Sequence, residues 1–170
     1  MKRLYLLRHA KAVHDETPDL ERPLTGRGRK DASLVGAWLS RKSRRPDAVL
    51  CSPSSRTMET WKALGEQLKA APEPRVLKSL YNASPSMLSA RIRSVSDMVE
   101  TLLVIGHNPG LQDLAIRLAG AGSKKRVVEK ASRKFPTAAL AVFEADVASW
   151  RELGESSARL VRVVKPKDLG

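Results

Sequence analysis

The sequence is poor in cysteine, in aromatic residues and in long apolar runs. Cys51 is the single cysteine among 170 residues, which excludes an intramolecular disulfide framework and favours a reducing compartment, so we expect a cytoplasmic protein. The first apolar run, residues 4–7, is too short for the core of a signal peptide or for a membrane span. We therefore expect neither an export signal nor a membrane partner.

Acidic residues are also scarce. The chain has 18 Asp and Glu against 31 Lys and Arg, which gives a formal net charge of +13. A basic surface attracts phosphorylated substrates as well as nucleic acid, although it is also compatible with ordinary solvated helix faces. The basic clusters at 27–30, 41–45 and 124–134 are not interleaved with aromatic residues, and no zinc-finger or RNA-binding motif accompanies them. Nucleic-acid binding is thus a secondary interpretation.

Strands and helices are predicted to alternate along the chain. The length suits one domain spanning residues 1–170. Short apolar runs predict strands, and amphipathic segments predict helices that begin near Thr25, Ser52, Met87 and Asn108, the first of them running to about Arg44. The basic stretch 120–134 is predicted to be a loop with at most one helical turn. The expected strands lie near residues 4–8, 47–51, 75–77, 101–105, 138–143 and 159–164.

This alternation predicts an α/β fold, with a mainly parallel sheet and helices on both faces. Ser52-Pro53 and Asn108-Pro109 each follow a predicted strand. Ser or Asn before Pro is typical of a helix that begins with a capping residue and then a proline. We expect Ser52 and Asn108 to cap two helices at the carboxyl ends of their strands.

Four charged or titratable side chains fall at these strand ends. Arg8 and His9 end the first strand, Arg56 lies in the first turn after the second, and His107 follows the strand at 101–105. The carboxyl ends of parallel strands share one edge of the sheet, where α/β proteins bind ligands. Two histidines and two arginines without a neighbouring carboxylate or thiolate make a poor metal site, so we expect no metal and no cofactor. They suit a phosphate dianion.

The residue types at this edge favour phosphoryl transfer. A neutral His9 is suited to attack phosphorus and carry the phosphoryl group, which water then removes. Arg8 and Arg56 would bind the phosphoryl oxygens and stabilise the charge of the transition state, with His107 as a further donor if it is protonated.

Four segments together resemble the histidine phosphatase superfamily, and most closely its short SixA-type phosphohistidine phosphatases. They are LLRHAKA near the N-terminus, RPLTGRG at 22–28, SPSSRTMET at 52–60 and VIGHNPG at 104–110. The resemblance implies a three-layer α/β/α sandwich of the phosphoglycerate mutase-like kind and no metal requirement. It also implies that His9 accepts the phosphoryl group in a pocket made by Arg8, Arg56 and His107. It places Arg22 beside this pocket, either as a substrate contact or in a structural ion pair.

One departure from the family pattern bears on the substrate. Phosphoglycerate mutase relatives carry a glutamate as general acid after the third strand, whereas residues 79–84 here contain no carboxylate. The lack of this acid argues against unactivated alkyl phosphates and favours phosphohistidine, although Asp15, Glu16 or Asp19 could supply a proton. We expect phosphohistidine in proteins, such as a histidine phosphotransfer domain, to be the substrate. The alternatives are a general phosphomonoesterase acting on small or activated esters and a non-catalytic phosphate-binding module.

Overall fold

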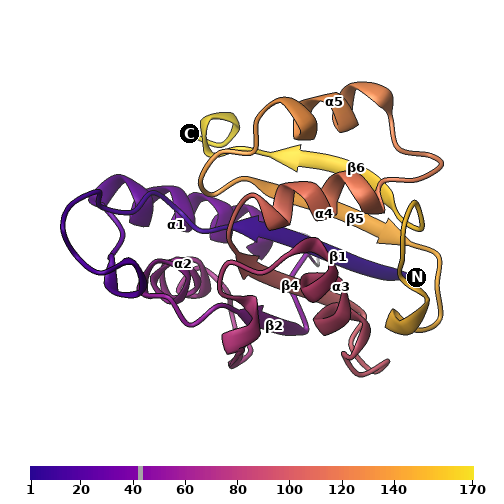
Figure 1. The fold of residues 1–170 in the computed structure, drawn as a ribbon, viewed down its shortest axis with the longest axis horizontal. Helices are drawn as coiled ribbons and strands as arrows, with labels where there is room; N and C mark the ends of the chain where they lie inside the picture. The colour runs from indigo at the N-terminus through magenta and orange to yellow at the C-terminus, as the bar shows by residue number, and fades with distance from the viewer. Residues whose placement is uncertain (42–43) are drawn as a thin grey trace.

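One six-stranded sheet with the order β3-β2-β4-β1-β5-β6 forms the centre of the computed structural model, which describes residues 1–41 and 44–170 (Figure 1). β1 is parallel to β4, and β2 is parallel to both β3 and β4, whereas β5 is antiparallel to β1 and β6. The expectation of a mostly parallel sheet is confirmed. The strands are β1 (Lys2–Arg8), β2 (Ala48–Cys51), β3 (Pro74–Val76), β4 (Thr101–Gly106), β5 (Leu140–Ala145) and β6 (Arg159–Val164).

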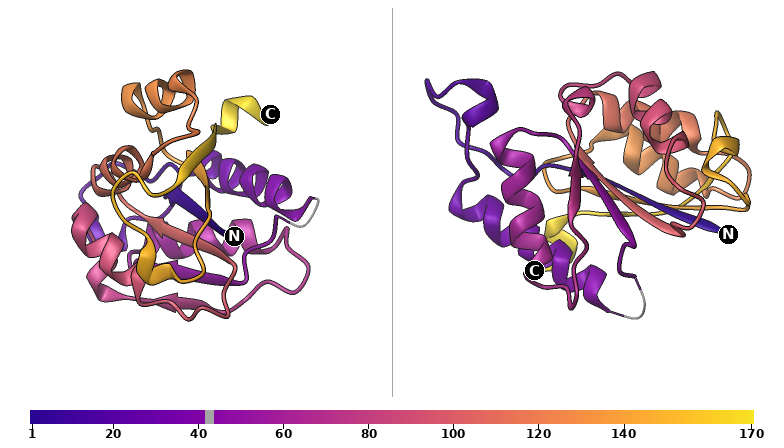
Figure 2. Two further views of the ribbon diagram at one scale, coloured as in Figure 1. Left: turned by 90° about the vertical axis from the view of Figure 1, so that its right-hand side faces the viewer. Right: turned by 90° about the horizontal axis from the view of Figure 1, so that it is seen from below.

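Helices cover both faces of the sheet, as the views in Figure 2 show. Alternate residues of β1 point to opposite faces: Leu4 and Leu6 belong to one apolar core, and Tyr5 and Leu7 belong to the other. The three-layer α/β/α sandwich is therefore confirmed. None of the described helices is long and apolar enough to cross a membrane. The helices are α1 (Gly26–Ser40) and α2 (Ser55–Gly65) on one face, and α3 (Pro85–Arg93), α4 (Gly110–Leu118) and α5 (Lys125–Arg133) on the other.

Two predicted helix caps were wrong, by two residues for α2 and by one residue for α4. Ser54, and not Ser52, caps α2, and its hydroxyl accepts a hydrogen bond from the Thr57 amide. The Ser52 amide still donates to the Ile105 carbonyl across the sheet, so the backbone directly after β2 remains hydrogen-bonded to β4 and the helix begins later. Pro109 occupies the capping position of α4, while the Asn108 side chain accepts from the Gln112 amide at 3.3 Å. Both shifts lengthen the connection between strand and helix, which runs over residues 52–54 after β2 and 107–109 after β4.

Two further helix boundaries also differ from prediction. The basic stretch 120–134 contains α5, a helix of nine residues. Its charged residues conceal an apolar side, on which Ala131 is fully buried while Val127 and Val128 pack against the core. The helix predicted to run from Thr25 to about Arg44 ends at Ser40, and the part of that prediction at 42–43 lies outside the described residues.

Candidate active site

The carboxyl ends of β1, β2 and β4 bring the four predicted site residues to one edge of the sheet. Arg8 ends β1 opposite Gly106 of β4, so His9 and His107 follow neighbouring strands at the same level. The centres of the two imidazole rings are 5.5 Å apart. Arg56 is the second residue of α2, and its guanidinium reaches His107.

The RPLTGRG segment supports the backbone that follows His9. The Thr25 amide donates to the Lys11 carbonyl at 2.9 Å, and the Thr25 hydroxyl caps α1 by accepting from the Gly28 amide at 3.0 Å. A Cβ atom on Gly28 would lie 2.1 Å from the Lys11 carbonyl oxygen, closer than any real contact. Gly28 therefore allows α1 to pack against the strand end.

His9 is held as a neutral ring with one nitrogen available. Its Nδ1 lies 2.8 Å from the Ala10 carbonyl oxygen, and because a carbonyl only accepts, Nδ1 carries the hydrogen. Burial, helped by the neighbouring guanidinium groups of Arg56 and Arg8, lowers the pKa of His9 to about 4. At neutral pH the Nε2 atom thus has a free lone pair, and it has no hydrogen-bond partner within residues 1–41 and 44–170.

His107 is also neutral in this structure. Its Nδ1 accepts from Arg56 Nη2 at 3.3 Å, so the hydrogen is on Nε2, which lies 2.7 Å from the Ser52 hydroxyl oxygen. Burial, and then the Arg56 charge, lowers the pKa of His107 to about 3. His107 can therefore act as the protonated donor expected from the sequence only when a bound anion, by its negative charge, raises this pKa.

Arg8 and Arg56 retain unused hydrogen-bond donors. The side chain of Arg56 is 4% exposed, and its Nη1 donates to the Asp19 carbonyl at 2.6 Å. Arg8 Nη1 donates to the Phe135 carbonyl at 3.0 Å. The Nε atoms of both arginines are buried without a partner in the described part of the chain. Buried donors without acceptors are rare, and an anion between the two arginines would satisfy them.

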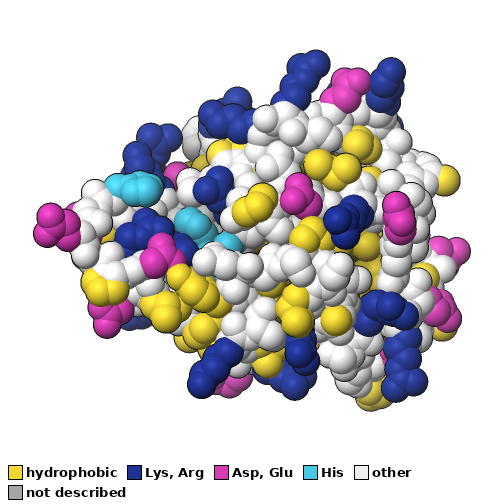
Figure 3. Space-filling model, in the orientation of Figure 1, with side chains coloured by type: hydrophobic (Ala, Val, Ile, Leu, Met, Phe, Trp, Pro, Cys, Tyr) yellow, Lys and Arg dark blue, Asp and Glu magenta, His cyan; other side chains and the backbone are white. Residues whose placement is uncertain are grey.

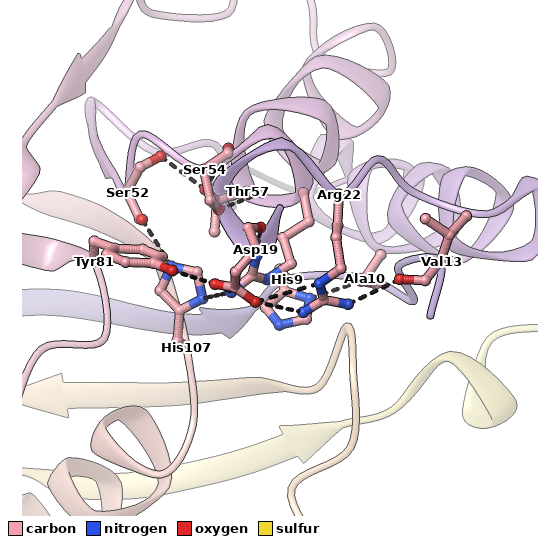
Figure 4. A network of polar contacts seen from close by, with 11 residues as sticks. His9, Ala10, Val13, Asp19, Arg22, Ser52, Ser54, Thr57, Tyr81 and His107 are labelled. Carbon is pink, nitrogen blue, oxygen red and sulfur yellow. Dashed lines mark hydrogen bonds and ion pairs between the residues drawn. The ribbon is translucent and has the colours of Figure 1, made fainter. Parts of the chain in front are cut away.

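Asp19 connects the first loop to this site (Figure 4). Its carboxylate accepts from Arg56 Nη2 at 3.0 Å, from Arg22 Nη2 at 3.0 Å and from the Tyr81 hydroxyl. The Tyr81 hydrogen bond and the two arginines hold the pKa of Asp19 well below its usual range. Arg22 also donates to the Val13 carbonyl at 2.9 Å, so its guanidinium forms a structural ion pair while it lines the cleft.

A cleft of about 690 Å³ opens over these residues. Figure 3 shows Lys and Arg side chains next to the histidines on this face, with acidic side chains nearby. The described residues contain no group of three His, Cys, Asp or Glu side chains that could hold a metal ion. Beyond the four predicted residues and Arg22, the basic side chains that line the cleft are Lys11, Arg27, Lys134, Lys165 and Lys167.

Sequence reasoning missed three polar contacts of this site. The sequence around Ser52 predicts a helix cap, but the Ser52 hydroxyl contacts His107. Tyr81 and Asp19 lie on separate loops, and they meet only through the fold. A short-range pattern could have suggested Ser52, because the residue after a strand at this edge faces the site, but no sequence signal pairs Asp19 with Arg56.

Comparison with known proteins identifies the family. The sequence pattern of the histidine phosphatase superfamily (branch 1) matches residues 4–82. The phosphohistidine phosphatase SixA of Escherichia coli is 30% identical over 108 residues, which cover 62% of this chain and 67% of SixA. The chain belongs to the histidine phosphatase superfamily. Protein Rv1276c of Mycobacterium tuberculosis is 38% identical over 163 residues, which cover 95% of this chain and all of that protein.

Solved structures of this superfamily share the fold over nearly the whole chain. A putative phosphohistidine phosphatase SixA from Nakamurella multipartitia has a TM-score of 0.85 and 28% identity, and the match covers 97% of this chain and 96% of that one. The protein histidine phosphatase SixA complexed with tungstate has a TM-score of 0.81 and 25% identity, with 99% of each chain covered. The six-stranded sheet and its helices are thus the fold of this enzyme superfamily.

Replacing Ser52 with alanine should weaken activity without unfolding the protein. The change leaves the His107 Nε2 hydrogen without its partner at 2.7 Å, so the ring loses its fixed orientation beside Arg56. We expect kcat/KM to fall on the order of tenfold, measured by steady-state kinetics. Ser52→Thr keeps the hydroxyl and should restore most of the rate; equal losses in both variants would contradict an orienting role for this hydroxyl.

The two buried histidines should make the protein less stable in mild acid. Their pKa values of about 4 and about 3 lie below the ordinary 6.5, so the unfolded chain binds protons first as the pH falls. Each histidine should lower the free energy of unfolding by about 2 kcal/mol between neutral pH and pH 5. Urea unfolding at pH 7, 6 and 5 tests this. A His9→Gln/His107→Gln double variant should lose most of the slope; an undiminished slope would assign it to other groups.

Proposed function

We propose that this chain is a phosphatase that uses His9 to remove the phosphoryl group from phosphohistidine in proteins. One observation carries the proposal. Neutral His9, whose Nε2 is unpartnered, lines the same cleft as Arg8 and Arg56, whose Nε donors are buried and unpartnered. A nucleophile next to two unsatisfied cationic donors is the arrangement needed to attack a bound phosphoryl group.

The reaction proceeds in two displacements. The His9 Nε2 lone pair forms a bond to phosphorus while the bond from phosphorus to the substrate imidazole breaks, and the released imidazole keeps that electron pair and takes up a proton. Water then attacks phosphorus, the bond to Nε2 breaks, and inorganic phosphate leaves neutral His9 behind. The guanidinium groups of Arg8 and Arg56 bind the phosphoryl oxygens in both steps and stabilise the charge of the transition state.

His107 and Ser52 serve the same oxygens in this proposal. A bound dianion favours the protonated form of His107, which then donates to a phosphoryl oxygen through Nδ1, the nitrogen that faces Arg56. Ser52 holds the other ring nitrogen at 2.7 Å. Arg22, which pairs with Asp19 at 3.0 Å, orders the loop around the pocket and is available as a further substrate contact.

The scarcity of proton-donating carboxyl groups near the site supports phosphohistidine over an alkyl phosphate as the substrate. Residues 79–84 contain no carboxylate. Asp19 accepts hydrogen bonds from Arg56, Arg22 and Tyr81, which keep it ionised. A leaving alkoxide needs a proton donor, whereas an imidazole leaves readily once its ring is protonated. The SixA relative is named a phosphohistidine phosphatase, which also supports this substrate class. The lone cysteine is consistent with a cytoplasmic setting.

The direct test compares two substrates in the presence of EDTA. Wild type and His9→Ala are incubated with a histidine-phosphorylated phosphotransfer protein and, separately, with para-nitrophenyl phosphate. We expect loss of the phosphohistidine that depends on His9, with little hydrolysis of the ester. Faster hydrolysis of the ester would favour a general phosphomonoesterase. Tungstate binding without turnover of either substrate would favour a phosphate-binding module.

Neutralising the exposed acids of the first loop should have little effect. Asp15 accepts from the Thr17 amide at 2.8 Å within its own loop, and Glu16 is exposed and has no hydrogen bond to the described residues. We expect Asp15→Asn/Glu16→Gln to keep kcat/KM for phosphohistidine within about threefold of wild type. Stopped-flow or quenched assays across pH 5–8 check this; a loss of the basic limb of the profile would identify one of them as the general acid.

A further inference from the structure

The cleft extends from the proposed phosphate pocket toward the edge strand β6, where Lys165 lies. Lys165 directly follows β6, and because β6 runs parallel to β1, its end is at the same edge as His9. Leu7 pairs with Leu140, and Leu140 pairs with Val164. Lys165 is therefore level with Arg8 but two strands away, which corresponds to about 10 Å between their backbones. This separation is too large for one phosphate group to bridge.

Lys165 is a largely buried residue whose ammonium lacks an anionic partner among the described residues. The residue is 8% exposed and lines the cleft. Its ammonium makes no hydrogen bond or ion pair with residues 1–41 or 44–170. The carboxylate of Asp168, the nearest acid along the chain, accepts instead from the Lys165 backbone amide at 3.1 Å and from Lys130 at 3.3 Å. The Lys165 ammonium is not among the fully buried nitrogens without a partner in the described part of the chain, so it is accessible from the cleft that the residue lines. An anion in the cleft could pair with it.

Further lysines raise the positive potential around Lys165. Lys134 at the end of α5 and Lys167 after β6 are exposed, and both line the same cleft. Burial, and then the charges of Lys130 and Lys167, lowers the pKa of Lys165, while the Asp168 charge acts in the opposite direction. Asp31 is the acidic residue that lines this cleft among the described residues, and it lies 3.9 Å from Arg27.

We propose that Lys165, flanked by Lys134 and Lys167, forms a second anion-binding subsite that takes the carboxylate of an acidic residue near the phosphorylated histidine of a protein substrate. The lysines run from the buried interior of the cleft to its exposed rim, which suits an acidic protein surface. This inference rests on the proposed function. It adds a sequence preference: phosphohistidine flanked by Asp or Glu is processed faster than phosphohistidine flanked by amides.

Two matched phosphohistidine peptides test the subsite. They are identical except that the Asp and Glu residues flanking the phosphohistidine in one are Asn and Gln in the other. We expect wild type to favour the acidic peptide on the order of tenfold in kcat/KM at low salt. Lys165→Met should bring the ratio close to one. The ratio compares two substrates on one enzyme preparation, so it does not depend on the fraction of enzyme that is folded.

Two other variants complete the experiment. Lys134→Glu/Lys167→Glu changes exposed residues only and should also reduce the preference for the acidic peptide. It therefore tests the subsite even if Lys165→Met does not fold. Lys69→Met removes one exposed charge outside the cleft and should retain the wild-type ratio. Equal rates on both peptides, or an equal drop in the Lys69 variant, would overturn the subsite but not the phosphatase. No His9-dependent turnover of either peptide would overturn both proposals.

Discussion

Replacing His9 with alanine should abolish turnover, with kcat lowered at least about ten-thousandfold. The reason is that Nε2 of His9 is the proposed nucleophile, and its neutral state and free lone pair depend on burial and on the 2.8 Å hydrogen bond from Nδ1 to the Ala10 carbonyl. Alanine provides no atom to carry the phosphoryl group. The arginines would remain to bind phosphate, so tungstate binding measured by calorimetry should survive while the reaction stops.

The phosphoenzyme provides an independent measurement of this role. Wild type mixed with a ³²P-labelled substrate and quenched in alkali should retain label that is stable in base and released by acid, as expected of a phosphorus–nitrogen bond, and His9→Ala should retain none. His14→Ala is the matched control, because His14 is the exposed histidine at the cleft. It should lower the rate by less than about tenfold. Label on His9→Ala would refute His9 as the acceptor.

Removing the Arg56 guanidinium should lower kcat/KM between about a hundredfold and a thousandfold. Arg56 supplies a buried, unpartnered Nε donor, and its Nη2 lies 3.3 Å from His107 Nδ1. Arg56→Ala therefore removes a proposed phosphate contact and a hydrogen bond to the His107 ring. Arg56→Lys retains the charge but loses the planar fork, and should recover only part of the rate. Tungstate affinity should decrease in parallel, because the same donors bind the ground-state anion.

The fold should survive the loss of Arg56. Asp19 would still be held by Arg22 at 3.0 Å and by the Tyr81 hydroxyl, so no carboxylate is left unpaired. Arg75→Ala is the control, since Arg75 is an exposed arginine on β3 that lies outside the cleft. Thermal unfolding monitored by circular dichroism checks that the variants are folded. If Arg56→Ala and Arg75→Ala reduce kcat/KM equally, the effect comes from net charge and not from a phosphate contact.

The order of these two effects follows from the proposed chemistry. His9 forms and breaks a covalent bond to phosphorus, and no other group can substitute for it. Arg56 shares the stabilisation of charge with Arg8, so part of it remains in the variant. A larger loss for Arg56→Ala than for His9→Ala would contradict the covalent intermediate.

Sequence patterns are sufficient to predict the α/β class and the edge of the sheet where the site lies. Apolar runs such as Thr101–Ile105 are buried on both faces, which is typical of central parallel strands. Because parallel strands all point the same way, the residues directly after them meet at one edge. The positions of Arg8, His9 and His107 along the chain therefore predict that they lie together. The roles assigned to these residues stay predictions for the experiments above.

Which polar atoms are already paired depends on the tertiary structure. Ser52 has the local sequence of a helix cap, but its hydroxyl contacts His107, 55 residues away. The Ser52 amide is held by the Ile105 carbonyl directly after β2, and α2 begins only at Ser55. Asp19 pairs with Arg56 across 37 residues. Such contacts depend on how the loops pack over the ends of the strands. Local sequence patterns do not encode this packing.

The same limit applies to α5 and to Lys165. The charged sequence of α5 conceals a helix that forms because Ala131 packs into the core, so tertiary burial overrides local polarity. Lys165 resembles any surface lysine in sequence, and it becomes a largely buried residue that lines the cleft only because β6 lies parallel to β1 two strands away. Local sequence determines the strands and their ends, whereas burial and pairing of charge arise only when distant segments pack together.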